Sequence, residues 1–450
     1  MFPLCLGKAL YLNHVELYFL RGHPMSLDRI ELSFPIASRP DGRLVFGPRR
    51  GWWLYGINYP WIRSHYGWDI GVDDPPLDSS GTPWQSQLTI SSNFESQVRA
   101  DLIDIHGKGL RVMRWFLLAD GRTIIEWDSN GYAIRLRQNA IARLRQIMTI
   151  ISKMRSLYQK RIYLIWCLLD FNFVDNYPAT PPQNHSDIMT HVGCSHPNRC
   201  KQRAFLNVLS ELIEILAEED SIIAWDLMNE PEWRASDIRP PPSNLRYGPL
   251  PNSAEMLNFF AQMIATIRQV ETKHQRKRHI TVGTCTHEAL DWIRGWNERR
   301  GRWNVGFYQI HAYCNYWNPG NECNNVLKPV QRFKLNKPII IGECNYRVSS
   351  TDIGVDAQCQ QLRQSGRLRP LLSQYDPYEE QSMARFLQSA FNMGYAGCLA
   401  WCYYSDDCDP KNMLWDESAI PAPARNWKRV ANTFTSFFSQ NQPMLDIVET

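Results

Sequence analysis

IIAWDLMNE, residues 222 to 230, is apolar at almost every position until it ends on Asn229 and Glu230. A strand that is apolar on both faces is typical of a parallel sheet covered by helices on both sides. Seven further runs of this kind occur along the chain, at residues 52–59, 110–118, 162–171, 279–284, 305–313, 338–343 and 397–404. We therefore expect eight parallel strands.

Segments with helical marks lie between these runs. Ser92 and Glu95 have the spacing of a capping box, apolar residues follow on one face, and Gly107 supplies a stop. Similar amphipathic stretches occupy residues 134–158, 200–219, 254–274, 286–299, 377–393 and 425–439, and a weaker one occupies 323–335. This alternation predicts an α/β fold, a (β/α)8 TIM barrel. An open doubly wound sheet is the alternative, but no GxGxxG follows any of the strands.

The domain organisation follows from the same pattern. We expect one catalytic domain over residues 45–450, with long loops on its carboxyl-terminal face, after an N-terminal extension over residues 1–44. The segment RPDGRLVFGPRRG, residues 39–51, carries a DG turn and predicts a hairpin that closes the bottom of the barrel. The Pro-rich stretch at 239–252 is either a wall beside a site or a surface excursion.

Composition excludes several classes of protein. With 450 residues, 44% hydrophobic and 21% charged, the chain is neither disordered nor fibrous. A net charge of +4, spread along the chain, is too weak to indicate a nucleic-acid partner. No run of about 18 apolar residues predicts a membrane span, and residues 1–22 do not have the pattern of a signal peptide. Oligomeric state is not encoded in these features.

Twelve cysteines are many for a reducing compartment. Three pairs have the short spacing of loop disulfides in an exported protein: Cys194 with Cys200, Cys314 with Cys323, and Cys402 with Cys408. Others, such as Cys167, Cys285 and Cys398, sit inside apolar runs and are expected to be buried thiols.

Two glutamates stand where the chemistry of such a barrel collects, at the carboxyl ends of its strands. Glu230 ends the fourth apolar run, and Glu343 ends the seventh in IIIGECNY. Facing carboxylates carry out glycoside hydrolysis, in which one protonates the leaving oxygen and the other attacks the sugar or activates water. A single Glu at a strand end is as often a solvated charge, but two of them favour a catalytic pair.

Asn229-Glu230-Pro231 after the fourth strand, with Glu343 after the seventh, resembles clan A of the glycoside hydrolases, most of all the cellulase-like family 5. Further matching positions are Arg114 in RVMRW, His311 and Tyr313 in QIHAY, and Trp401 in LAWCY. The resemblance spans residues 51–404 in the family's order.

This resemblance implies a retaining hydrolase of β-linked glycans, of the β-mannan or β-glucan type, that works by double displacement without cofactor or metal. Glu230 is expected to be the acid and base, and Glu343 the nucleophile. The remaining expected roles, all in substrate binding or alignment, are Arg114 and Tyr313 holding Glu343 ionised, Asn229 bonding the sugar 2-hydroxyl, His311 orienting Tyr313 or Glu230, and Trp401 forming the floor under the ring.

One departure concerns the third strand. Many family 5 members carry a His near its end, whereas this chain reads CLLDFNFVDN, with Asp170 and Asn172 there. Either side chain is expected to replace the lost hydrogen bond to the sugar. Four aromatic residues near strand ends are candidates for flanking sugar platforms or for ordinary packing: Trp61, Trp115, Trp233 and Trp317.

Three alternatives remain open. A zinc site is conceivable in one loop, with His185, His191, Cys194, His196 and Cys200, although its spacing fits no standard motif and a Cys194–Cys200 disulfide or free thiols are favoured. A carbohydrate-binding barrel without turnover is the second, because fold does not guarantee activity. An exo-acting β-glycosidase or transglycosylase of the same clan is the third. The presence of both glutamates favours an enzyme.

Overall fold

The computed structural model describes the barrel strands, most of the surrounding helices and parts of the loops. The described residues are 36–38, 43–47, 52–60, 70, 94–121, 123–174, 185–190, 194, 200–238, 250–285, 287–300, 305–314, 327–346, 386–401 and 436–437.

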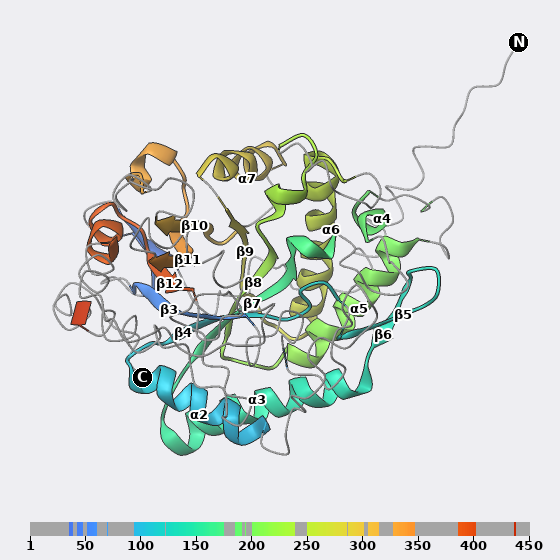
Figure 1. The fold of residues 1–450 in the computed structure, drawn as a ribbon, viewed down its shortest axis with the longest axis horizontal. Helices are drawn as coiled ribbons and strands as arrows, with labels where there is room; N and C mark the ends of the chain where they lie inside the picture. Colours follow the sequence, from blue (N-terminus) through green and yellow to red (C-terminus); the bar gives the residue numbers. More distant parts are fainter. Residues whose placement is uncertain are drawn as a thin grey trace, which may run out of the picture.

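Eight parallel strands close into a barrel, with helices around its outside (Figure 1). Each predicted apolar run overlaps one strand, so the predicted (β/α)8 barrel is confirmed. In chain order the strands are β3 (Leu54–Tyr59), β4 (Val112–Phe116), β7 (Tyr163–Asp170), β8 (Ile222–Asn229), β9 (His279–Thr284), β10 (Tyr308–Cys314), β11 (Ile339–Tyr346) and β12 (Gly397–Ala400). β12 pairs with β3 and closes the ring.

The helices lie around the outside of the barrel (Figure 1). They are α2 (Phe94–Gly107), α3 (Gln138–Tyr158), α4 (Ser186–Met189), α5 (Lys201–Leu216), α6 (Ser253–Lys273) and α7 (His287–Arg300). α6 starts at a capping box, in which Asn252 Oδ1 accepts from the Glu255 backbone N–H at 3.0 Å and Glu255 Oε2 accepts from that of Asn252 at 2.8 Å. Short 3₁₀ helices follow three strands or loops: η4 (Phe171–Phe173), η5 (Pro231–Arg234) and η7 (Val330–Phe333).

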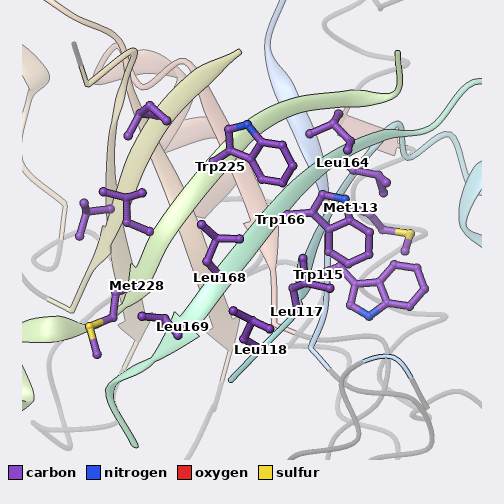
Figure 2. Close-up of a cluster of buried hydrophobic side chains, with 14 of the residues drawn as sticks. Met113, Trp115, Leu117, Leu118, Leu164, Trp166, Leu168, Leu169, Trp225 and Met228 are labelled. Carbon is purple, nitrogen blue, oxygen red and sulfur yellow. The ribbon is translucent and has the colours of Figure 1, made fainter. Parts of the chain in front are cut away.

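The main core lies between the barrel wall and these helices. Trp115, Trp166 and Trp225 come from three adjacent strands and are fully buried there (Figure 2). The Trp115 and Trp166 rings pack with their centroids 5.1 Å apart. All eight barrel strands contribute side chains to this core, which explains why the sequence runs are apolar on both faces: one face fills the barrel and the other meets the helices.

Two antiparallel hairpins stand outside the barrel. β1 (Ile36–Ser38) pairs with β2 (Leu44–Phe46), and Phe46 is buried in a cluster with residues at the amino ends of the strands, including Leu54 and Phe307. The predicted Asp41–Gly42 turn lies outside the described residues, and the domain boundary at residue 44 stays a prediction.

The second hairpin, β5 (Ile125–Trp127) with β6 (Ala133–Leu136), corrects the sequence-based expectation. The predicted helix over 134–158 begins only at Gln138, because residues 133–136 pair with β5. The turn between the strands is built by Asp128, whose Oδ1 accepts from the backbone N–H of Asn130 at 2.9 Å and of Tyr132 at 2.8 Å.

The structure also bears on the predicted cysteine pairs. Cys194 and Cys200 form a disulfide, as favoured over the zinc site. The other two predicted loop pairs involve Cys323, Cys402 and Cys408, which lie outside the described residues, as does most of the Pro-rich stretch, residues 239–249. Among the helices described, none has the length and apolar character needed to cross a membrane.

Candidate active site

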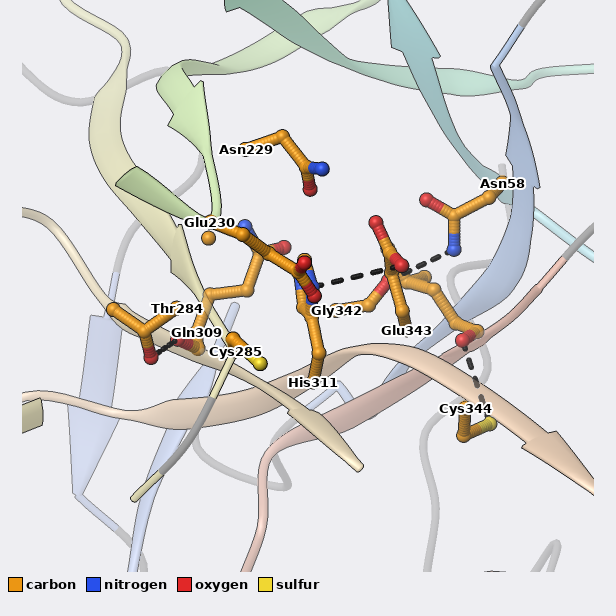
Figure 3. Close-up of polar contacts among 12 residues, drawn as sticks. Asn58, Asn229, Glu230, Thr284, Cys285, Gln309, His311, Gly342, Glu343 and Cys344 are labelled. Atoms are coloured by element: carbon orange, nitrogen blue, oxygen red, sulfur yellow. Dashed lines mark hydrogen bonds and ion pairs between the residues drawn. The ribbon is translucent and has the colours of Figure 1, made fainter. Parts of the chain in front are cut away.

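Glu230 and Glu343 converge at the carboxyl end of the barrel, with His311 between them (Figure 3). Glu230 directly follows β8, Glu343 lies on β11 and His311 lies on β10. One ligand-type atom from each of the three side chains lies within 4.8 Å of the other two. The two carboxylates therefore lie close together, as predicted.

The Glu230 backbone turns sharply as it leaves the strand. Its φ of 46° and ψ of 51° are left-handed, a conformation that is costly for a residue with a side chain. Pro231 starts η5 and forbids a continued strand, while the Glu230 N–H donates to the Gly283 carbonyl on β9 at 2.7 Å. Together these contacts aim the carboxylate across the barrel mouth toward Glu343.

Arg114 on β4 connects the site from beneath. Its Nη1 donates to Glu343 Oε1 at 2.6 Å and to Asn58 Oδ1 at 3.0 Å. Its Nη2 donates to Asn229 Oδ1 at 2.9 Å, and its Nε donates to Asp226 Oδ2 at 2.8 Å. All three nitrogens of this buried guanidinium are therefore used, and the side chain can hold both Glu343 and Asn229 in place.

Charge compensation keeps Arg114 ionised inside the barrel. Burial alone would lower the pKa of the guanidinium, but the nearby Asp226 and Glu343 carboxylates raise the pKa above its ordinary value. Cys167 also lies 3.4 Å from Nη2, and burial raises the pKa of its thiol well above the ordinary range, so it stays neutral. Arg114 is consequently a fixed positive charge beside the proposed nucleophile.

Asp226 is a residue of the site that sequence reasoning missed. It is fully buried on β8 and accepts from Arg114 Nε, from the Gly283 N–H at 2.9 Å and from Gln309 Nε2 at 2.7 Å. Asn58 was missed as well, and its Nδ2 donates to the Gly342 carbonyl at 2.8 Å. The available signal was a single charged letter inside the apolar run IIAWDLMN, because a charge in a fully buried strand needs a partner.

Two glycines make room for this network. A β-carbon at Gly342 would lie 2.3 Å from the Gln309 side chain, and one at Gly283 would lie 2.9 Å from both Gln309 Nε2 and His311 Nε2. Any larger residue would displace the groups that hold Asp226 and His311, so these positions require the close backbone approach that glycine permits.

His311 contacts both glutamates through one ring nitrogen. Nδ1 lies 2.7 Å from Glu230 Oε1 and 3.5 Å from Glu343 Oε2. Burial lowers the pKa of His311 to about 4, and the Arg114 charge acts in the same direction. The imidazole is thus neutral near pH 7 and can either donate to an ionised Glu230 or accept from a protonated one, depending on its tautomer.

Asp170 lies where the resemblance placed a sugar-binding group. The side chain is buried, its Oδ1 accepts from the Asn172 backbone N–H at 3.0 Å, and its Oδ2 accepts from Asn229 Nδ2 at 2.9 Å. Asp170 therefore orients Asn229 and caps η4. The Asn172 side chain is partly exposed. Direct contacts of these two residues with sugar stay a prediction.

The aromatic candidates differ in position. Trp401, at the end of β12, is partly exposed and packs beside Phe116 with ring centroids 6.1 Å apart. Trp233 is also partly exposed, and its indole N–H donates to Glu230 Oε2 at 2.8 Å. Trp115 is wholly buried, so ordinary packing accounts for it. Trp61, Trp317 and the Tyr313 side chain lie outside the described part of the structure.

The described residues of the alternative zinc site have other partners. Cys194 and Cys200 are joined in a disulfide, and His185 is stacked on Trp127 with ring centroids 4.2 Å apart. Burial lowers the pKa of His185 to about 3. His191 and His196 lie outside the described residues. Within the described residues, the only cluster with metal-ligand chemistry is Glu230, His311 and Glu343, where Arg114 already supplies a positive charge.

Comparisons with known proteins find relatives in sequence and in fold. No family model matches the chain. A curated mannan endo-1,4-beta-mannosidase from Mytilus edulis is 24% identical over 318 residues, which are 65% of this chain and 75% of that protein. The chain resembles the family 5 glycoside hydrolases of clan A. This confirms the resemblance predicted from Asn229-Glu230-Pro231 and Glu343.

Solved structures show the same fold. A beta-1,4-mannanase from Aplysia kurodai has a TM-score of 0.58 at 15% identity, covering 92% of this chain and 100% of that one. The beta-mannanase from Mytilus edulis has a TM-score of 0.53 at 18% identity, covering 90% and 96%. A GH5_18 protein from Bifidobacterium longum has a TM-score of 0.51 at 12% identity, covering 87% and 80%.

Proposed function

We propose that this chain is a retaining glycoside hydrolase that cleaves β-mannan, with Glu343 as nucleophile and Glu230 as acid and base. The observation that carries the proposal is the convergence of the two carboxylates, whose nearest oxygens lie within 4.8 Å. Retaining enzymes hold their carboxyl groups about 5 to 5.5 Å apart, whereas inverting enzymes leave about 6.5 to 9.5 Å for a water molecule.

In the first step, Glu343 attacks the anomeric carbon and Glu230 gives its proton to the leaving oxygen. The attack requires an ionised nucleophile, and the Arg114 contact at 2.6 Å favours that state. Asn229 is held by Arg114 on its oxygen and by Asp170 on its nitrogen, which keeps its remaining hydrogen-bonding capacity aimed at the sugar 2-hydroxyl.

In the second step, Glu230 removes a proton from water, and the resulting hydroxide breaks the bond between Glu343 and the sugar. The neutral His311 at 2.7 Å suits both steps, because its Nδ1 can face a protonated or an ionised Glu230 without adding charge. Trp401 offers a flat, partly exposed ring as a floor for the sugar at the cleavage point.

The choice of β-mannan rests on the relatives, since the mussel protein that shares 24% identity is named a mannan endo-1,4-beta-mannosidase. A carbohydrate-binding barrel without turnover is disfavoured by the intact contacts around both glutamates. We propose cleavage inside the polymer, and an exo-acting or transglycosylating enzyme is the outcome to distinguish by product length.

The test is reducing-end release from β-mannan, β-1,4-glucan, mixed-linkage glucan, xylan and aryl β-glycosides. Wild type is compared with Glu343→Ala and with Glu126→Ala, a partly exposed carboxylate on the β5–β6 hairpin. We expect release from mannan by wild type and Glu126→Ala, and loss of at least about 10⁴-fold in Glu343→Ala, the scale found when a nucleophile is removed. Binding of mannan without release by wild type would contradict the proposal.

A further inference from the structure

Glu230 has a separate partner on each of its two oxygens. Oε1 faces His311 Nδ1 at 2.7 Å, and Oε2 accepts from the Trp233 indole N–H at 2.8 Å. The Glu230 side chain is only 13% exposed, so the two contacts cover much of its hydrogen-bonding capacity. His311 belongs to β10, which is separated from β8 by β9, whereas Trp233 is three residues away from Glu230 along the chain.

The local backbone places the indole on the carboxylate. Glu230 adopts left-handed dihedrals and Pro231 starts η5, so that the Trp233 backbone N–H donates to the Glu230 carbonyl at 3.2 Å. The 3₁₀ turn thereby stacks residue 233 over residue 230. Phe171 of η4 packs beside the Trp233 ring with centroids 6.5 Å apart, and Arg234 lies over Phe171 at 5.0 Å. Phe171 therefore supports the indole, and Arg234 packs on Phe171.

The two partners differ in what they can do chemically. An indole N–H can only donate, whereas a neutral imidazole nitrogen donates or accepts according to its tautomer. Trp233 therefore favours an unprotonated Oε2 in both steps of the reaction. A transferable proton on Glu230 consequently belongs on Oε1, and the ionised carboxylate needed as base keeps a donor when that proton is gone.

We propose that Trp233 is a positioning residue for Glu230, which assigns the transferable proton to Oε1 and stabilises the ionised form that activates water. This inference rests on the proposed function. It differs from the role expected from sequence, in which Trp233 is a sugar platform, because a platform needs only the ring face and this role needs the indole N–H.

Trp233→Phe separates the two roles, since it keeps a flat ring and removes the donor. We expect the alkaline limb of the kcat/KM profile to move up by about one pH unit, a tenfold change in the ionisation of Glu230. For an activated dinitrophenyl β-glycoside, whose turnover is limited by the second step, we also expect kcat and KM to fall together, with kcat/KM nearly unchanged. Trp127→Phe is the matched control, because it loses an indole hydrogen bond to the Gly121 carbonyl at 3.1 Å.

An unshifted alkaline limb in Trp233→Phe, with KM as the only altered constant in Trp233→Ala, would overturn the inference in favour of a platform. If Trp233→Phe does not fold, Trp233→Gln and Trp233→Leu repeat the comparison with and without a donor. The outcome is separate from that of the proposed function: Glu343→Ala tests hydrolysis, and an active wild type whose Trp233→Phe profile is unmoved would reject only the role of Trp233.

Discussion

The two ends of the barrel are built from the same eight strands but from opposite side chains. At the amino end, Leu54, Phe307 and Ile340 belong to an apolar cluster that includes Phe46 of β2. At the carboxyl end, Arg114 and Asp226 are buried with polar partners and support Glu343. Apolar packing stabilises the fold wherever it occurs, whereas buried charges are tolerated only where each has its partners. The difference indicates that the amino end serves stability and the carboxyl end serves chemistry.

The largest effect is expected from removing a buried charge at the carboxyl end. Asp226→Ala leaves Arg114 without one of its two carboxylates, which we expect to lower the free energy of unfolding by about 3–5 kcal/mol. It should also reduce kcat/KM by about 100-fold, because Arg114 no longer holds Glu343 and Asn229 in register. Urea unfolding and kinetics at low temperature measure the two effects.

Asp220→Ala is the control for Asp226→Ala. Asp220 also pairs with arginines, at 3.3 Å to Arg155 and 2.9 Å to Arg276, but its side chain is 41% exposed. We expect Asp220→Ala to lower the free energy of unfolding by less than about 1 kcal/mol. Similar losses of unfolding free energy in both variants would show that burial does not determine how much these charges contribute to stability.

At the amino end, Phe307→Ala should affect stability alone. Phe307 packs edge-to-face on Phe46 with ring centroids 5.3 Å apart and is fully buried. Its truncation is expected to cost about 3–5 kcal/mol of unfolding free energy, since it leaves a cavity. The kcat/KM of the folded fraction should stay at the wild-type value. A large fall in kcat/KM would mean that the two ends are not functionally separate.

Acid should weaken the fold through histidines that are buried in the neutral form. Burial lowers the pKa of His185 to about 3, below the ordinary value near 6.5 that the unfolded chain has. As the pH falls, the unfolded state therefore binds the proton first. The stability that neutral, buried His185 contributes is complete above pH 6.5 and is lost as the pH falls toward the folded pKa. His185→Phe should flatten the fall in unfolding free energy below pH 6.5 by about 1 kcal/mol per pH unit. Parallel curves for variant and wild type would contradict this assignment.

The smallest effect, of opposite sign, is expected at the surface between α5 and α6. Hydrogen bonds that the His274 ring donates to Glu218 and Glu214 raise the pKa of His274 above its ordinary value. Its contribution to stability is thus complete below pH 6.5 and is lost as the pH rises through the higher folded pKa. His274→Gln should lower Tm slightly at pH 6 and not at pH 9. A difference at pH 9 would indicate packing rather than charge.

Sequence patterns predicted the barrel strands better than the β5–β6 hairpin. All eight strands follow from nearly continuous apolar runs such as residues 222–230, because each barrel strand is buried on both faces. The hairpin that contains residues 133–136 was taken for the start of a helix, although Asn130 and Gly131 in its turn were a signal for paired strands.

Within the site, Glu230 and Glu343 were predictable because each ends an apolar run, whereas Asp226 and Asn58 were missed. Glu230 stands out because it interrupts an apolar run at its end, where barrel chemistry is expected. Asp226 lies four positions earlier, and its contact with Arg114 joins residues 112 positions apart. Such a contact depends on the register of β4, β7 and β8, which periodicity alone does not supply.

The anomeric configuration of the first product tests the central claim most directly. Mannohexaose is cleaved inside an NMR spectrometer, and the anomeric proton of the new reducing end is followed before mutarotation. Carboxylates whose oxygens lie within 4.8 Å predict that the β anomer appears first and the α anomer only later. Initial formation of the α anomer would mean inversion, and Glu343 could not then be the nucleophile.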